Sequence, residues 1–202
     1  MHSFGIQGVM KDGLKERMSC VIGQDRMIIK KRDSVMEKVV IIINGRGGVG
    51  KDTLCDLAAK HFKVKNISAI TPIKEIAQNY GWNGQKDSRS RKFLSDLKRV
   101  FIDYNDLPTK YLYEQYRIFL DDDNQFLFIH IREKEEIEKL KKLIDIKCLT
   151  LLIQRNQNDI KKWGNASDDE VENYEYDLCY NNDRSLIETE KEFVAFLEKL
   201  LV

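Results

Sequence analysis

Apolar residues recur along the chain in two patterns: short continuous runs, and longer stretches with helical spacing. The segments at 39–43, 64–70, 126–129, 148–153 and 176–180, of which the second and the last also contain polar residues, predict five strands. The first run reads Val-Val-Ile-Ile-Ile, and a continuous β-branched run of this kind is typical of a strand that is covered on both faces of a parallel sheet. We therefore predict that 39–43 forms the central strand.

Between these runs, apolar residues recur every three or four positions, which predicts helices at 51–62, 73–80, 90–104, 109–120 and 133–143 and from 185 onward. In the helix at 133–143, we expect Ile137, Leu140 and Leu143 to point inward. Alternation of strands and helices predicts an α/β three-layer sandwich, in which a parallel five-stranded sheet carries helices on both faces. In such a fold, ligands bind at the carboxyl ends of the strands.

The segment between the first strand and the first helix is rich in glycine and ends in a lysine. A nucleotide phosphate needs many N–H donors and few side chains in the way, and glycines followed by a helix start provide both. The lysine reaches the β- and γ-phosphates, so Lys51 is a candidate catalytic residue. The pattern predicts a P-loop NTPase fold with ATP as cofactor, bound by nine consecutive residues: Gly45, Arg46, Gly47, Gly48, Val49, Gly50, Lys51, Asp52 and Thr53.

One position of this loop departs from the usual pattern. The Ser or Thr that commonly follows the lysine and ligates Mg²⁺ is replaced by Asp52, with Thr53 one residue later. A carboxylate beside phosphates is repulsive unless a cation lies between them, so Asp52 is a candidate Mg²⁺ ligand. The alternative is an acidic residue that is favoured at this position only by the helix dipole.

Basic side chains beyond the loop are candidates for binding a second substrate. Arg91 follows a turn-rich segment at 81–87, where it can hold a phosphate through two hydrogen bonds, and Lys86 within that segment can assist it. The alternative interpretation of both is a solvated helix start. Arg132 comes just after a buried strand, on the ligand side of the sheet, and is a candidate catalytic residue. Phosphoryl transfer needs such cations around the transferring group.

The G-x-x-x-x-G-K-D-T form of the loop resembles that of phage deoxynucleoside monophosphate kinases and, more loosely, that of animal-type phosphomevalonate kinases. Segments 68–75, 131–137 and 155–181 are also similar to parts of these enzymes. The resemblance implies an acceptor-binding segment at about 71–120 that includes Lys74, and a lid at about 155–175 whose Arg155 closes over the donor phosphates as a catalytic residue. Where relatives often carry an acidic residue at the end of the third strand, this chain has His130.

The chain is expected to divide into an N-terminal appendage at 1–37 and a kinase-like domain at 38–202. Residues 1–37 show no clean periodicity, and we interpret them as a disordered segment or as one that precedes the native start, since Met36 lies just before the first strand. A length of 202 residues suits one such domain.

Charge and composition narrow the possible partners. The 34 basic and 33 acidic side chains nearly cancel, which argues against nucleic-acid or membrane binding, and no apolar run approaches the roughly 20 residues of a spanning helix. We expect a cytoplasmic monomer or homodimer whose partner is a small-molecule phosphate acceptor, with a nucleoside or deoxynucleoside monophosphate as the leading candidate. A phosphomevalonate-like metabolite kinase is the nearest alternative, and an ATPase or nucleotide-dependent switch with a protein partner is an alternative of another class.

Overall fold

A computed structural model describes residues 37–85, 87–155 and 171–201. The appendage up to residue 36, Lys86 and most of the expected lid lie outside the described residues. Five strands form one parallel sheet in the order β2-β3-β1-β4-β5: β1 (Val39–Asn44), β2 (Val64–Ser68), β3 (Phe126–His130), β4 (Cys148–Gln154) and β5 (Leu178–Asn181). This confirms the five predicted strands and the central position of the first.

The helices follow the predicted spacing, with boundaries shifted by a few residues. They are α1 (Lys51–Ala59), α2 (Thr71–Asn79), α3 (Ser88–Asn105), α4 (Leu107–Asp121), α5 (Lys134–Lys141) and α7 (Leu186–Glu198), with short 3₁₀ turns η2 (Val171–Asn173) and η3 (Lys199–Leu201). The predicted inward position of Leu143 is wrong, because α5 ends at Lys141 and the Leu143 side chain is 43% exposed. None of the helices in these ranges is long and apolar enough to cross a lipid bilayer.

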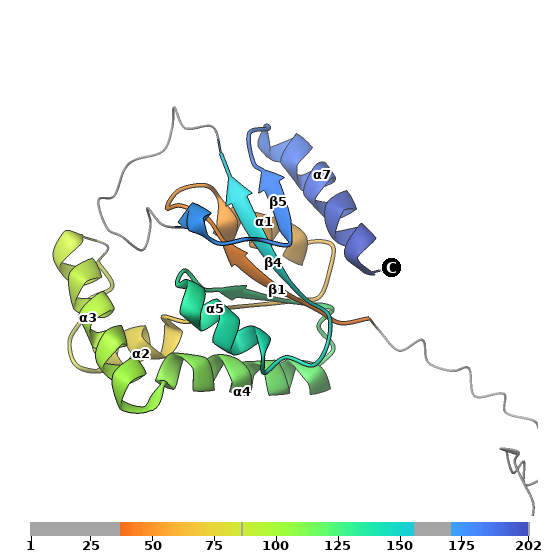
Figure 1. The fold of residues 1–202 in the computed structure, drawn as a ribbon. Coiled ribbons are helices and arrows are strands. Elements are labelled where there is room, and N and C mark those ends of the chain that lie inside the picture. Colours follow the sequence, from red (N-terminus) through yellow and green to blue (C-terminus); the bar gives the residue numbers. More distant parts are fainter. Residues whose placement is uncertain (1–36, 86, 156–170, 202) are drawn as a thin grey trace, which may run out of the picture. The chain divides into compact units, whose positions relative to one another are not determined.

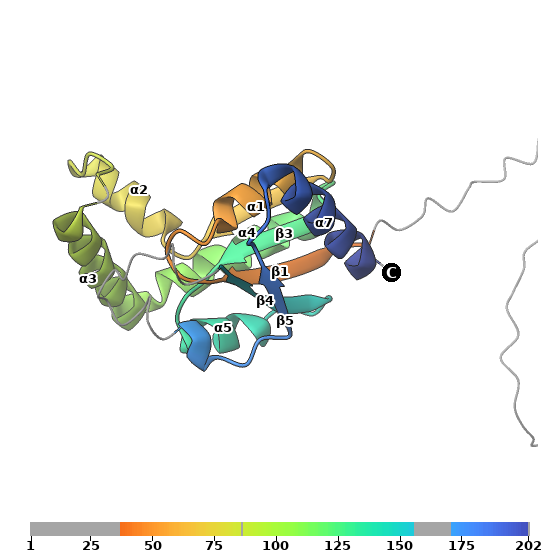
Figure 2. The same cartoon turned by 90° about the horizontal axis from the view of Figure 1, so that it is seen from above.

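Two apolar clusters hold the helices against the two faces of the sheet. Val39, Ile41 and Ile43 of β1 pack with α1 and α7, whereas Val40 and Ile42 pack with α4 and α5. Alternate residues of a strand point to opposite faces, so burial on both sides accounts for the unbroken apolar run of β1. The structure is the predicted three-layer sandwich, and Figure 2 shows α1 and α7 on one side of the sheet and α5 on the other.

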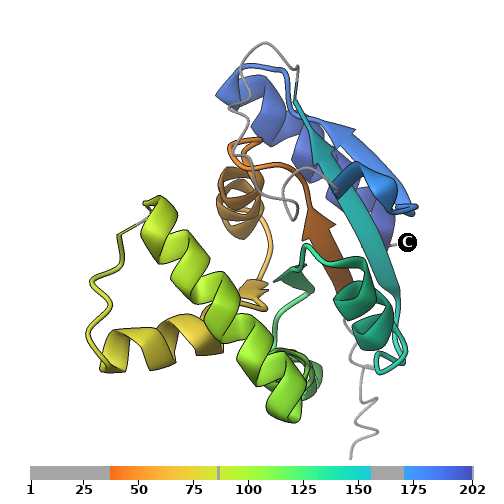
Figure 3. The same cartoon turned by 60° about the vertical axis from the view of Figure 1, so that its left-hand side comes forward.

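Helices α2 and α3 stand apart from these two layers. A third apolar cluster, around Ile73, Ala77 and Leu94, packs them against each other, and both also contact α4. In Figures 1 and 3 they lie at the opposite end of the fold from α7. Within the segment 71–120, which we expected to bind the acceptor, α2 and α3 therefore form a separate group of helices beside the sheet, whereas α4 packs against the sheet.

Candidate functional site

The loop between β1 and α1 depends on glycine for its shape. Gly45, Gly48 and Gly50 have φ angles of 146°, 89° and 92°, which other residues rarely adopt. A Cβ atom at Gly45 would lie 2.5 Å from the carbonyl oxygen of Ile153, and one at Gly50 would lie 2.5 Å from Nδ2 of Asn182. A Cβ atom at Gly48 would meet no atom within 4 Å. The loop is therefore pressed against the ends of β4 and β5 at two glycines and is open at the third.

We expect Gly45→Ala to destabilise the protein more than Gly48→Ala does. Both changes force an L residue to a positive φ at a cost of about 1–3 kcal/mol, but only the first also meets a backbone oxygen that cannot move aside. Urea unfolding of the two variants measures the difference, which should be at least about 1 kcal/mol in the free energy of unfolding. Equal losses would contradict this account of the loop.

Two buried asparagines hold the loop in place. Asn44, which is 1% exposed, accepts a hydrogen bond from the N–H of Gly45 (2.8 Å) and donates to the carbonyl oxygen of Arg132 (3.2 Å) and to the hydroxyl of Tyr176 (2.8 Å). Asn182 donates to the carbonyl oxygen of Val49 (2.8 Å). The asparagines thus join the loop to the segments that follow β3 and β5. Sequence reasoning missed both of them, although a polar residue directly after a buried apolar run was a visible signal at Asn44.

The Lys51 side chain lies inside the loop. Its Nζ atom donates to the carbonyl oxygens of Gly45 and of Arg46, the second at 2.9 Å. The loop also joins the first turn of α1, whose N–H groups have no partner within the helix and whose dipole is positive at this end. A mobile ammonium, backbone N–H groups and a positive helix end converge here, and together they suit a bound polyphosphate.

Asp52 and His130 lie beside the loop. The Asp52 side chain is 91% exposed, and its Oδ1 is 4.0 Å from Nε2 of His130, which lies 2.8 Å from Oδ1 of Asn66. An exposed carboxylate on the first turn of α1 suits Mg²⁺, which is usually held by one or two carboxylates together with substrate phosphates. No group of three or more His, Cys, Asp or Glu side chains that could hold a metal ion occurs within the described ranges. Most ligands of a Mg²⁺ ion at Asp52 would therefore have to come from the bound phosphates and from water.

Burial, together with smaller effects of the nearby cations Lys51, Arg132 and Lys74, lowers the pKa of His130 to about 4 despite the opposing effect of Asp52. His130 is therefore neutral at pH 7. The unfolded chain takes up a proton near pH 6.5 while the folded protein does not, so this contribution to stability is present above pH 6.5 and is lost as the pH falls toward 4.

We expect wild type to lose about 2 kcal/mol more stability than His130→Gln between pH 7.5 and pH 5, which follows from a pKa that falls from 6.5 to about 4. Glutamine keeps a polar group beside Asn66 but does not titrate. Urea unfolding of both proteins at the two pH values gives the difference. Identical losses would show that His130 does not titrate differently in the folded and unfolded states.

A cavity of about 390 Å³ opens beside the loop at Gly47 and Gly48. Its lining includes Lys74 from α2, Arg91 from α3 and Arg132 from the segment after β3. The structure thus brings three of the predicted substrate-binding and catalytic cations, from three separate elements, to one pocket next to the glycines. Trp82, Gln85, Ser95, Lys98 and Glu133 also line this pocket, and none of them is among the site residues predicted above from the sequence. We call this cavity the acceptor pocket.

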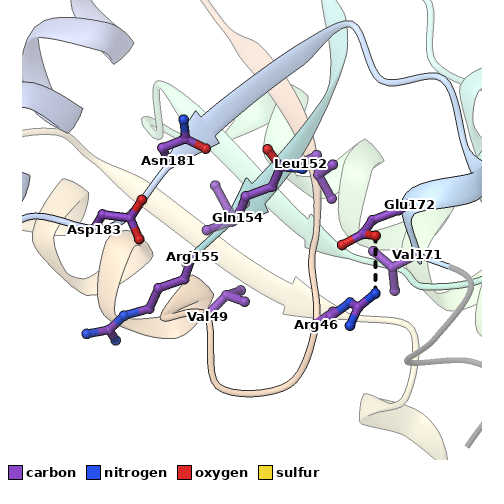
Figure 4. A pocket seen from close by; sticks show the side chains of 10 residues that line it. Arg46, Val49, Leu152, Gln154, Arg155, Val171, Glu172, Asn181 and Asp183 are labelled. Carbon is purple, nitrogen blue, oxygen red and sulfur yellow. Dashed lines mark hydrogen bonds and ion pairs between the residues drawn. The ribbon is translucent and has the colours of Figure 1, made fainter. Parts of the chain in front are cut away.

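Arg155 lies elsewhere. It lines a second cavity, of about 240 Å³, together with Arg46, Val49 and the residues that follow β5. In Figure 4, Arg155 extends from the end of β4 on the side of Asp183, while Arg46 forms an ion pair with Glu172 (3.1 Å) on the other side of Val49. Arg155 is therefore placed beside the outer surface of the loop and not in the acceptor pocket.

Comparison with known proteins shows the fold of the chain. No family model and no curated protein matches the sequence. Among solved structures, a putative kinase from Chloroflexus aurantiacus is 13% identical, with 82% of this chain and 96% of that one covered and a TM-score of 0.50. The APS kinase of Mycobacterium tuberculosis is 13% identical over 80% and 98% of the two chains (TM-score 0.48), and a gluconokinase from Sinorhizobium meliloti is 12% identical over 82% and 94% (TM-score 0.47). With its parallel sheet and glycine loop, the chain has the α/β P-loop NTPase fold.

Proposed function

We propose that this protein is a kinase that transfers the γ-phosphate of ATP, with Mg²⁺, to a phosphorylated small molecule, with a nucleoside or deoxynucleoside monophosphate as the leading acceptor. One observation carries the proposal: the acceptor pocket begins at Gly47 and Gly48 and collects Lys74, Arg91 and Arg132. A phosphate monoester bound by these cations would lie beside the loop that holds the donor phosphates. A kinase needs this proximity, because transfer depends on holding donor and acceptor in line.

Each element of the site has a separate part in the reaction. Bound ATP and Mg²⁺ supply the phosphoryl group and a divalent charge that offsets the negative charge of the phosphates. The loop binds the phosphates through backbone N–H groups, and Lys51 adds a positive charge. Asp52 is the candidate side chain for holding Mg²⁺. Arg132 is the cation best placed to contact both the acceptor and the transferring group, because it follows β3, the neighbour of β1 in the sheet.

The three cations of the acceptor pocket match the charge of a phosphate monoester. A monoester carries close to two negative charges at neutral pH, and arginine can hold it with two parallel hydrogen bonds. Lys74, Arg91 and Arg132 come from different elements, so the rigid frame of the fold, rather than one flexible segment, sets their spacing. This arrangement favours an acceptor that already bears a phosphate over a neutral sugar or alcohol.

A coupled assay of ADP release tests this proposal. ATP and Mg²⁺ are supplied with each nucleoside and deoxynucleoside monophosphate in turn, with phosphomevalonate, and with no acceptor. We expect ADP release to depend on a monophosphate. Turnover with phosphomevalonate alone would favour the metabolite-kinase alternative, and ADP release that needs no acceptor would favour an ATPase.

A further inference from the structure

A buried lysine joins two carboxylates at the wall of the acceptor pocket. Lys98 of α3 is 9% exposed, and its Nζ lies 2.7 Å from Oε2 of Glu133 and 2.7 Å from Oε1 of Glu136. Glu133 precedes α5 directly and Glu136 lies in its first turn. A buried charge is costly unless it is paired, so the short contacts fix the positions of all three side chains.

The two carboxylates differ in their surroundings. Glu136 is 6% exposed and does not line the pocket, and burial raises its pKa despite the opposing effect of Lys98. Glu133 keeps 35% of its side chain exposed and lines the pocket together with Lys98. Lys98 donates a hydrogen bond to Oε2 of Glu133 (2.7 Å). Glu136 therefore helps to hold the Lys98 side chain in place, and Glu133 presents a carboxylate of fixed position to the pocket.

A carboxylate in a pocket of cations favours some groups on a ligand and repels others. An ionised carboxylate only accepts hydrogen bonds, so its partner on a ligand must be a hydroxyl or an N–H group. It also repels a second anionic group on the same ligand, and within a pocket this repulsion is less screened than in water. A neutral side chain at this position would show neither effect.

We infer that Glu133 determines acceptor specificity by accepting a hydrogen bond from a hydroxyl or N–H group on the uncharged part of the acceptor and by excluding acceptors with a carboxylate there. Lys98 is the positioning residue that holds it. This inference rests on the proposed function and narrows it: the acceptor is a phosphate monoester with a neutral, hydroxyl-bearing body. A nucleoside monophosphate meets this description, whereas phosphomevalonate, which carries a carboxylate, does not.

Two substitutions at this position separate hydrogen bonding from repulsion. Glu133→Gln removes the charge but keeps the shape, whereas Glu133→Asp keeps the charge and withdraws it by one methylene. Loss of a hydrogen bond to a charged group corresponds to about 10–100-fold in affinity. We expect both variants to raise the KM and Kd for the best monophosphate acceptor by about this factor, with the KM for ATP unchanged. Only Glu133→Gln should improve binding of phosphomevalonate.

The control variant is Glu135→Gln, an exposed carboxylate on the first turn of the same helix. It should leave all these constants and the melting temperature unchanged. An unchanged KM and Kd for the monophosphate in Glu133→Gln, or a change equal to that of the control, would overturn the inference.

Calorimetric titration with each acceptor, measured separately from turnover, distinguishes this inference from the proposed function. A monophosphate that binds, responds to Glu133→Gln and is never phosphorylated would reject the kinase proposal and keep the inference. Turnover with an acceptor whose Kd and KM are the same for the wild type and for Glu133→Gln would reject the inference alone. Failure of the wild type to bind any monophosphate would reject both.

Discussion

Lys51→Met is expected to lower kcat for phosphoryl transfer by about 10²–10³-fold, the cost of removing one preorganised group that stabilises charge in a transition state. The Lys51 ammonium lies among the carbonyl oxygens of the loop, where it donates to Gly45 and Arg46. Methionine keeps the length of the side chain, so the melting temperature should change little.

Steady-state kinetics and titration with a fluorescent ATP analogue measure this effect, and Lys110→Met serves as a matched control because Lys110 is exposed on α4. Weakened binding of the analogue together with lost turnover is expected for Lys51→Met alone. A kcat within a factor of about three of the wild-type value would mean that the loop does not carry the chemistry. This variant does not separate a kinase from an ATPase, because both need the lysine.

Arg132→Met, the second large effect, tests transfer to the acceptor. An arginine that stabilises the transferring phosphoryl group contributes about 10³-fold or more in kcat, so kcat/KM for the acceptor should fall by at least this factor. Binding of ATP should be retained, since the hydrogen bond from Asn44 to the backbone oxygen of Arg132 does not use the side chain, and the substitution leaves that bond intact.

Arg117→Met, at an exposed position of α4, is the matched control for removal of a guanidinium. If the Arg132→Met enzyme keeps the wild-type kcat/KM for the acceptor, Arg132 has no role in phosphoryl transfer. Equal losses in affinity for ATP and for the acceptor would instead indicate a general disturbance of the loop, and the melting temperature would then fall as well.

Local patterns in the sequence were sufficient to predict the framework of this fold. The strand β1 is a β-branched run buried on both faces. Glycines at this spacing between a strand and a helix are typical of a phosphate-binding loop. Arg91 and Arg132 could be proposed because one follows a turn-rich segment and the other a strand end on the ligand side of a parallel sheet, and Lys74 was proposed through the family resemblance of segment 68–75. The structure places all three around one cavity, while their roles stay predictions.

The hydrogen bonds and ion pairs that hold the site residues in place could not be predicted, because they join distant parts of the chain. Asn44 meets Tyr176 across 132 positions, and Lys98 meets Glu133 across 35. In α3, helical spacing alone does not separate buried from exposed side chains: Phe93 matches the apolar period but is 46% exposed, whereas Lys98 is buried. Such a lysine becomes recognisable only when its carboxylate partners are known, since a buried charge needs a pair.

The most direct test of the central claim follows the γ-phosphate itself. ATP labelled at that phosphate is incubated with the protein, Mg²⁺ and an equimolar mixture of nucleoside and deoxynucleoside monophosphates, and the products are separated by chromatography. The account predicts that the label appears in a nucleoside diphosphate and that Arg132→Met abolishes this transfer. Label found only in inorganic phosphate, at the same rate with and without acceptors, would contradict it.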